Sequence, residues 1–248
     1  MSSTPNARQH SGNEGAFTAT HWTLVLLAGQ GAPPEADAAL ASLCQRYWKP
    51  LYCYVRRLGH TAEDAQDLVQ GFFARLLAKN YLKDADPGKG RFRTFLLITL
   101  KRYLANEWDR AKRQKRGGGL EILPLDSEDV ETRYLADPAI SVSPEKCYDQ
   151  QWALSLLARV LDRLEQEYDA GGKRRTFREL KVFLTGDRGE VSYAETARKL
   201  GLAEGAVKIT VHRLRQRYGA MVRKEIAETV ASPEMVDEEL RHLLAALS

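Results

Sequence analysis

The chain has 248 residues, of which 44% are hydrophobic and 28% are charged, and its formal net charge at pH 7 is +4. This length suits one large domain or two small ones, and the composition is that of a protein with an apolar core. No apolar run is long enough to cross a bilayer, and the polar first residues lack the pattern of a signal peptide. We therefore expect a cytoplasmic protein that has no membrane partner.

The three cysteines, Cys44, Cys53 and Cys147, form no CxxC pair and have no histidine nearby at metal-ligand spacing. They predict three reduced structural thiols. The sequence also has no Gly-rich phosphate loop and no nucleophile motif. We therefore expect a protein that is not an enzyme and that uses neither a metal nor another cofactor.

The first part of the chain predicts a disordered N-terminus over residues 1–19 and a helical domain over 20–116. After a short helix near its start, this domain has apolar residues that repeat every three or four positions, as in amphipathic helices. Thr61 is the predicted N-cap of one of them, with Asp64 three residues later. The longer helices are predicted at about 35–58, 61–79 and 91–116.

Residues 91–119 change character along their length. The first half has a helical apolar stripe, whereas residues 101–116 contain seven Lys or Arg against two acids, before three glycines follow. Phe95, Tyr103 and Trp108 lie just before or among these charges. Because basic groups neutralise phosphates and aromatic rings stack on unpaired bases, this stretch predicts a nucleic-acid surface, including one for single strands.

The rest of the chain predicts an acidic linker over 117–146, a second helical domain over 147–230 and a C-terminal helical extension over 231–248. Helices are expected at about 147–168, 174–184, 193–200, 204–229 and 233–247. The fold class is therefore all-α, with two small helical domains joined by the linker. For the extension we consider two hypotheses: it restrains a basic DNA-binding face, or it completes the core of the second domain.

Residues 192–218 have the spacing of a helix-turn-helix. Ser192 and Glu195 predict a capping box for the first helix, Gly201 predicts its end, and Glu204 begins the second helix. The apolar positions of the second helix repeat at four, three and four residues: Val207, Val211, Leu214 and Tyr218.

Burial of that stripe determines which side chains face outward. The outward set is Gly205, Ile209, His212, Arg213 and Gln216. The flanks carry Lys208, Thr210, Arg215 and Arg217. A helix in the major groove reads base edges with its first residues, and its flanking cations contact phosphates. This second motif therefore predicts a surface that reads duplex DNA.

The two motifs together resemble the bacterial RNA polymerase sigma factors of the extracytoplasmic-function (ECF) group of the sigma-70 family, over about 40–116 and 148–222. AEDAQDLVQGFFARLL (62–77) is similar to the family's acidic helix that docks on the polymerase. RFRTFLLITLKRYLANEWDRAKRQKR (91–116) resembles the helix that melts and reads the promoter near the start site, in region 2. SYAETARKLGLAEGAVKITVHRLRQRY (192–218) resembles the helix-turn-helix of region 4, which reads the more distant promoter element.

The resemblance implies that core RNA polymerase and promoter DNA, duplex and melted, are the partners. It places Asp64, Asp67 and Gln70 at the polymerase. It places the following residues at DNA: Arg102, Asn106, Arg110, Arg113, Lys208, His212, Arg213 and Arg215. We add Trp108 and Lys112 for their aromatic and basic character, and Ile209 and Thr210 for their positions on the second helix.

The chain departs from the family pattern at several positions. Gln66 and Gly71 stand near where the family often has further acids, which predicts weaker docking on the polymerase. Tyr103 and Glu107 stand where Asn and Asp are common. An anti-sigma protein or a kinase is a further expected partner, because phosphorylation of Thr61 would add charge to the docking helix.

Two other functions are considered beside this one. A stand-alone helix-turn-helix transcriptional regulator would explain residues 192–218 and leave the aromatic and basic helix at 91–116 without a role. An enzyme would have to use Asp64 and Asp67 to hold a divalent ion, as in some nucleases, and neither a histidine nor an acid cluster joins them.

Overall fold

The structure is a computed structural model, and it describes residues 35–78, 91–113, 142–185, 192–230 and 232–248. The predicted disordered N-terminus, the short helix near residue 20 and most of the predicted acidic linker lie outside these residues. Within the described ranges every regular element is helical, which confirms the all-α fold class.

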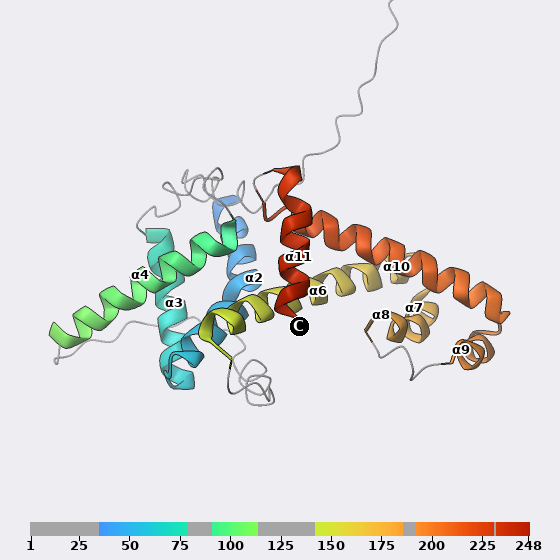
Figure 1. The fold of residues 1–248 in the computed structure, drawn as a ribbon, viewed down its shortest axis with the longest axis horizontal. Helices are drawn as coiled ribbons and strands as arrows, with labels where there is room; N and C mark the ends of the chain where they lie inside the picture. Colours follow the sequence, from blue (N-terminus) through green and yellow to red (C-terminus); the bar gives the residue numbers. More distant parts are fainter. Residues whose placement is uncertain (1–34, 79–90, 114–141, 186–191, 231) are drawn as a thin grey trace, which may run out of the picture.

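The described residues form a series of helices. Their bounds are α2 Glu35–Arg57, α3 Ala62–Ala78, α4 Phe92–Arg113, α6 Pro144–Ala170, α7 Arg174–Leu180, α8 Val182–Thr185, α9 Tyr193–Leu200, α10 Glu204–Ala227, the 3-10 turn η3 Pro233–Met235 and α11 Val236–Ala246. Figure 1 shows that α6 and α10 are the long helices that connect the two ends of the molecule. At one end lie α2, α3 and α4, and at the other lie α7, α8 and α9.

The buried apolar residues form two clusters that share α6. The first cluster joins α2, α3 and α4 to the first half of α6, with Tyr148, Trp152 and Leu156 among its buried members. The second cluster joins the second half of α6 to α7, α9 and α10, around Leu164 and Phe177. Because α6 is buried in both clusters, it connects the two ends of the molecule through packing as well as through the chain.

Helix α6 begins earlier than its apolar pattern predicted. Ser143 is its N-cap, and the side-chain oxygen of Ser143 accepts a hydrogen bond from the backbone N–H of Lys146 at 3.2 Å. Pro144 occupies the first turn, where its missing N–H costs nothing. The helix therefore starts within the stretch that the sequence assigned to the linker, because capping rather than apolar periodicity sets its first turn.

The C-terminal helix α11 packs against the middle of the molecule. Its Leu243 and Ala246 are buried in the first cluster, together with Val222 and Ile226 of α10. Of the two hypotheses for the extension, the structure agrees with a tail that completes a core. The core is the one that α6 and α10 share with α2, rather than one belonging to the helix-turn-helix alone.

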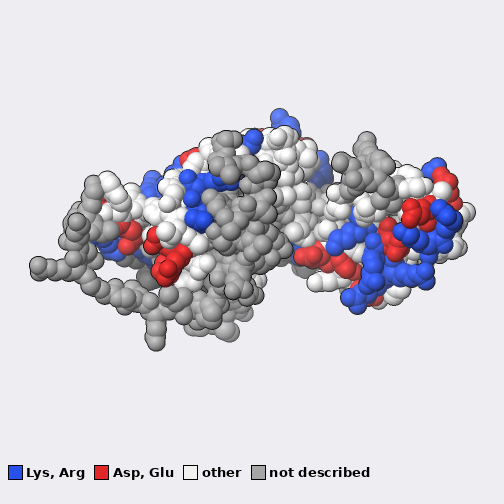
Figure 2. All heavy atoms as spheres, turned by 90° about the horizontal axis from the view of Figure 1, so that it is seen from below, with Lys and Arg blue, Asp and Glu red and all other residues white. Residues whose placement is uncertain are grey.

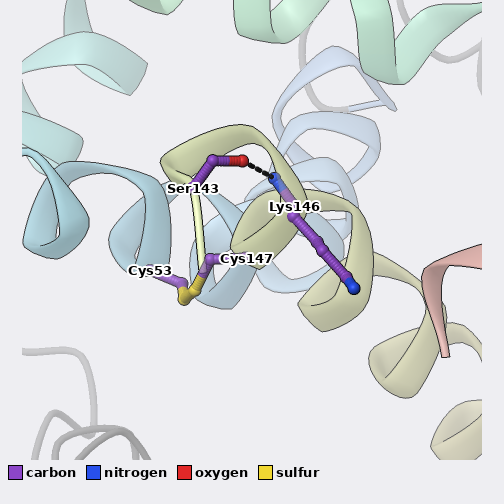
Figure 3. The surroundings of a disulfide bond; sticks show 4 residues. All are labelled: Cys53, Ser143, Lys146 and Cys147. Carbon is purple, nitrogen blue, oxygen red and sulfur yellow. Dashed lines mark hydrogen bonds between the residues drawn. A yellow bond between two sulfur atoms is a disulfide. The ribbon is translucent and has the colours of Figure 1, made fainter. Parts of the chain in front are cut away.

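The expectation of three reduced thiols is wrong for two of the cysteines. Cys53 in α2 and Cys147 in the first turn of α6 form a disulfide, with their Cα atoms 6.1 Å apart (Figure 3). Cys44 has a free thiol. No spacing motif marks this pair, because its members are 94 residues apart in sequence and meet only through the packing of α6 on α2.

Candidate nucleic-acid and polymerase interfaces

Helix α4 is packed at its first half and exposed at its second half. Phe92, Leu96 and Leu100 are buried in the first cluster, as the apolar stripe predicted. Beyond them, α4 extends past α3 toward the left edge of Figure 1. A helix with one end fixed in a core presents the side chains of its other end on a rigid support.

Four of the predicted DNA-binding residues of α4 have exposed side chains: Arg102, Asn106, Trp108 and Arg110. At about 100° per residue, Arg102 and Asn106 lie about 40° apart on one flank of the exposed face, and Trp108 lies on its other flank, about 120° from Arg102. Lys112 and Arg113 belong to the last turn of α4, and their side chains lie outside the described part of the structure.

Of the three aromatic residues expected at the nucleic-acid surface, only Trp108 is exposed, with 62% of its surface accessible. Phe95 packs on Phe92, with ring centroids 6.0 Å apart. Tyr103 packs on Phe72 of α3 at 5.8 Å. Phe95 and Tyr103 are thus partly buried by packing within the protein, and Trp108, the one aromatic residue assigned to DNA, is the exposed ring of the three.

Tyr103 also explains the glycine at position 71 of the docking helix. A Cβ atom on Gly71 would lie 2.5 Å from the Tyr103 hydroxyl oxygen, which is closer than real contacts allow. Burial, followed by the nearby Glu107 carboxylate, raises the pKa of Tyr103 to about 12, so its hydroxyl stays protonated. The departure from the family pattern at Gly71 is thus coupled to the departure at Tyr103: the tyrosine fills the space that a side chain at 71 would need.

Glu107, the other departure on α4, joins α4 to α3. Its carboxylate accepts hydrogen bonds from Arg75 of α3 at 3.0 Å and from Arg110 at 2.8 Å. Arg110 is therefore exposed to solvent and at the same time forms an ion pair with Glu107. Arg75 also lies over the Tyr103 ring, with its guanidinium carbon 5.9 Å from the centroid.

The predicted polymerase-binding residues lie on α3. Asp64 and Asp67 are exposed, and Gln70 is partly buried. The predicted cap is confirmed: the Thr61 hydroxyl accepts from the Asp64 backbone N–H at 3.1 Å and donates to the Asp64 carboxylate at 2.8 Å. Asp64 therefore stabilises the start of α3, whereas Asp67 stands in the middle of the helix as an exposed carboxylate.

The helix-turn-helix is formed by α9, a short turn and α10. Gly201 ends α9 with φ 67°, a left-handed conformation that glycine adopts without strain, as the sequence predicted. The predicted capping box is not formed: Ser192 makes no side-chain cap bond, and Glu195 instead pairs with Lys199 at 3.1 Å. The backbone of Ser192 still has the extended conformation of an N-cap.

The buried side of α10 is the predicted one. Val207, Val211 and Leu214 are buried, and Tyr218 is partly buried. As a result Ile209, His212 and Arg213 are exposed, with 56% of the Ile209 surface accessible. Figure 2 shows Lys and Arg side chains gathered over this end of the molecule, with some acidic residues among them.

The flanking residues of α10 differ in the hydrogen bonds and ion pairs that their side chains make within the protein. Thr210 donates its hydroxyl hydrogen to the Ala206 carbonyl at 2.7 Å. Arg215 donates to the Phe183 carbonyl through two nitrogens, at 3.2 and 3.0 Å. Lys208 pairs with Glu204 at 2.6 Å, and this pairing raises the pKa of Lys208. Among these predicted residues Arg213 has no ion pair within the described structure.

Helix α7 supplies basic residues that the sequence analysis did not assign to DNA. Arg174, Arg175 and Arg178 are exposed, and Arg175 donates to the Lys199 carbonyl at the end of α9 at 2.9 Å. The basic run that begins at Lys173 is visible in the sequence. It did not stand out because only the packing of α7 on α9 brings it beside the helix-turn-helix.

Two buried carboxylates, both missed in the sequence analysis, pair with arginines of other helices. Glu225 of α10, with 1% of its side chain exposed, pairs with Arg46 of α2 at 2.9 Å and with Arg163 of α6 at 2.7 Å. Glu239 of α11, with none exposed, pairs with Arg91 and Arg93 at the start of α4, each at 2.7 Å.

Arg93 is the centre of the second group of charges. It pairs with Asp149 of α6 and lies over the Trp152 ring, 4.6 Å from its centroid. Charged groups are rarely buried unless they are paired. A lone acid within an apolar stripe, such as Glu225 or Glu239, therefore predicts a buried ion pair, but the sequence does not identify the basic residue that completes it.

In the described residues, no helix combines the length and the apolarity needed to cross a bilayer. Within the same residues, no group of three or more His, Cys, Asp or Glu side chains is arranged to hold a metal ion.

Comparison with known proteins agrees with these features. The family model for sigma-70 region 2 matches residues 43–114, which extend from α2 to just past the end of α4. The chain is also similar to the ECF RNA polymerase sigma factor SigE of Mycolicibacterium smegmatis, with 29% identity over 204 residues that cover 82% of this chain and 67% of that protein. No solved structure matches it. The chain thus contains a sigma-70 region 2 segment, and its likeness to an ECF sigma factor extends well beyond that segment.

Proposed function

We propose that this protein is a sigma factor that binds core RNA polymerase through α3, melts promoter DNA with α4, and reads a more distant duplex element with α10. The likeness to sigma factors supports a non-catalytic role in transcription initiation. The division of tasks between the helices is our proposal. It implies that the protein works in the cytoplasm, where bacterial RNA polymerase is found.

The observation that carries the proposal is that the projecting end of α4 exposes Trp108 as well as Arg102, Asn106 and Arg110. Opening a duplex costs about 1.4 kcal/mol for each stacked step, so a protein that holds DNA open has to recover several times that amount. Stacking of an unpaired base on an aromatic side chain contributes about 1–3 kcal/mol, and cations beside it retain the strand.

Helix α10 suits a different task. Its exposed residues Ile209, His212 and Arg213 lie in its first half, which is the part of a recognition helix that contacts base edges. The basic residues of α7 and α9 beside it suit contacts with phosphates.

Binding to core polymerase is tested by co-sedimentation of the purified full chain. Asp67→Asn is the sharper variant, because Asp64 also caps α3 and its replacement would weaken the helix itself. We expect Asp67→Asn to reduce binding to polymerase, whereas Asp162→Asn, an equal change of charge on the exposed side of α6, should leave it unchanged. Salt-sensitive binding to duplex DNA without any binding to polymerase would favour the stand-alone regulator instead.

The melting step is tested by the permanganate reactivity of thymines in a promoter fragment that has been selected with the holoenzyme. Trp108→Ala should keep the affinity for polymerase and lose the reactivity of the thymines. Full reactivity in this variant would overturn the assignment of α4 to strand capture.

Thr61 remains the proposed site of regulation by a kinase. Its hydroxyl already donates to Asp64, so a phosphate there would have to replace that bond. A Thr61→Glu variant that binds polymerase no better than the original chain would remove this proposal. An anti-sigma protein remains a proposal on the resemblance alone.

A further inference from the structure

The first turn of α6 is fixed by local structure before any covalent bond is considered. The Ser143 cap orders the turn, and the Cys147 backbone N–H donates to the Ser143 carbonyl at 3.0 Å. Cys147 therefore has a set position relative to the helix axis. Figure 3 shows it facing Cys53 across the contact between α6 and α2.

The two helices hold these cysteines at bonding distance through packing of their own. Cys53 and Cys147 are 5% and 2% exposed, and Tyr52 and Tyr148 beside them are buried as well. Their Cα separation of 6.1 Å falls within the range of about 4.4–6.8 Å that disulfides require. Formation of the bond therefore needs no rearrangement of the backbone, and the pair is favoured over mixed disulfides with small thiols.

Acidic residues on either side of Cys147 contact basic residues of α4. Glu145 pairs with Lys101 at 2.7 Å, and Asp149 pairs with Arg93. Lys101 lies at the beginning of the exposed basic part of α4, and its ammonium is also 5.6 Å from the Tyr54 ring of α2. A covalent bond at Cys147 thus keeps the Glu145 carboxylate next to a cation that could otherwise contact a phosphate.

We propose that Cys53 and Cys147 are a reversible redox pair, and that their oxidation fixes the first turn of α6, with Glu145, against Lys101 of α4. The effect on DNA rests on the proposed function of α4, whereas the redox chemistry and the fixing of α6 do not. In the reduced protein packing alone holds the first turn of α6 on α2, so the turn opens more often and Lys101 becomes more available to DNA.

The oxidant is a peroxide. A cysteine thiolate attacks one peroxide oxygen, the O–O bond breaks, and the leaving oxygen takes up a proton as water, which leaves a sulfenic acid. The second thiol then attacks the sulfenic sulfur, the S–O bond breaks, and a second water leaves as the disulfide forms. In sum, two thiols and one hydrogen peroxide give one disulfide and two waters, and a cellular dithiol reverses the reaction by exchange.

The compartment and the third cysteine both support a switch rather than a permanent bond. In a reducing cytoplasm a disulfide is usually transient and either catalytic or redox-sensing. Cys44 is not a competing partner for Cys53, because the two lie nine residues apart in α2. That spacing is about 13 Å along a helix axis, which is beyond the reach of a disulfide.

The first experiment maps the thiols in the full-length protein. After reduction, alkylation under denaturing conditions should label all three cysteines. After treatment with hydrogen peroxide and quenching, mass spectrometry should find Cys53 and Cys147 joined and Cys44 labelled. Loss of labelling through sulfinic acids, or any other pairing, would overturn the redox assignment.

The second experiment compares hydrogen exchange in the oxidised and reduced protein. Backbone amides in the first turn of α6 should exchange at least about tenfold more slowly after oxidation, because leaving α2 is no longer permitted. Equal exchange rates would show that the bond does not hold this turn, whatever the function of α4.

The third experiment measures the affinity for a single-stranded oligonucleotide at low salt. Oxidation should weaken binding by about threefold to tenfold, as expected for the loss of about one phosphate contact. The Glu145→Gln variant should bind with nearly equal affinity in both states, and Cys44→Ser should respond like the original chain.

A Cys53→Ser/Cys147→Ser variant should bind like the reduced protein and not respond to peroxide. If this variant does not fold, Cys147→Ala serves in its place. A disulfide that forms and slows exchange while leaving DNA affinity unchanged would overturn the link to Lys101. No DNA binding in either state would count against the proposed function of α4, while the first two experiments still decide the redox pair.

Discussion

The exposed end of α4 and the exposed face of α10 are both basic, yet they are built differently. The projecting end of α4 exposes an indole as well as arginines, and one of those arginines is paired with Glu107. The helix-turn-helix has no aromatic residue between Tyr193 and Tyr218, and several flanking groups of α10 bond to the protein itself. The comparison teaches that two surfaces of similar charge can differ in aromatic character. Under the proposed function, the exposed ring distinguishes the surface for open strands from the one for duplex.

The largest effect, a loss of stability, is expected when the buried ion pairs between α11 and the start of α4 are broken. In Glu239→Gln the buried Arg93 loses part of its charge pairing, which should lower the free energy of unfolding by about 3 kcal/mol, near the lower end for a broken buried pair because Asp149 remains. Urea unfolding followed by circular dichroism measures this change. The control is Glu238→Gln, an exposed neighbour, which should cost at most about 1 kcal/mol. Equal losses in the two variants would show that burial of Glu239 does not matter.

The next effect should separate the two surfaces. Trp108→Ala should weaken the capture of a single strand by about 1–3 kcal/mol, because a stacking surface is lost. It should leave the affinity for a duplex bound by α10 unchanged. Trp108→Tyr, which keeps a ring, should retain most of the single-strand binding. Competition between labelled single-stranded and duplex oligonucleotides measures both affinities, and an equal loss for both would contradict the assignment.

A smaller effect concerns the packing that supports the projecting end of α4. Gly71→Ala places a Cβ against the Tyr103 hydroxyl and should destabilise the protein by about 1 kcal/mol, since the tyrosine can shift only partly against Phe72. Adding Tyr103→Phe removes the oxygen and should restore the stability. Thermal unfolding of the single and double variants tests the coupling, and additive losses would show that the two positions are independent.

The smallest effect is expected on the duplex-facing helix. Lys208→Gln should weaken duplex binding by a few-fold regardless of sequence, and it should reduce the slope of log affinity against log salt by about 1, as for one phosphate contact. Arg213→Ala should instead change which sequences are preferred. Filter-binding titrations at several salt concentrations distinguish the two. An unchanged salt slope in Lys208→Gln would mean that its pairing with Glu204 persists on DNA.

The sequence predicted well wherever a local rule decides the structure. The stripe of Val207, Val211 and Leu214 follows from helical periodicity, and Gly201 follows from the left-handed turn that ends α9. Thr61 with Asp64 follows from capping. The assignment of residues to polymerase and DNA agrees with their exposure in the structure but stays a prediction, since exposure does not identify a partner.

The sequence failed where contacts between distant segments decide the structure. Tyr103 is spaced like a member of the apolar stripe, but only the crossing of α3 identifies Phe72 as its partner. Cys53 and Cys147 lack a spacing motif, and Glu239 finds its arginines near the start of α4. Ser192 shows the opposite error, since a correct local pattern did not produce the expected side-chain bond.

The sharing of α6 between the two clusters has a consequence for dissecting the protein into fragments. The segment that the region 2 family model matches ends at residue 114, before Tyr148, Trp152 and Leu156 complete the first cluster. A fragment cut at that boundary would expose the apolar side of α2 that these residues cover, and exposed apolar patches of this kind favour aggregation. In this protein the segment that matches the family model is therefore smaller than the unit of folding, and a fragment intended for expression should extend through α6.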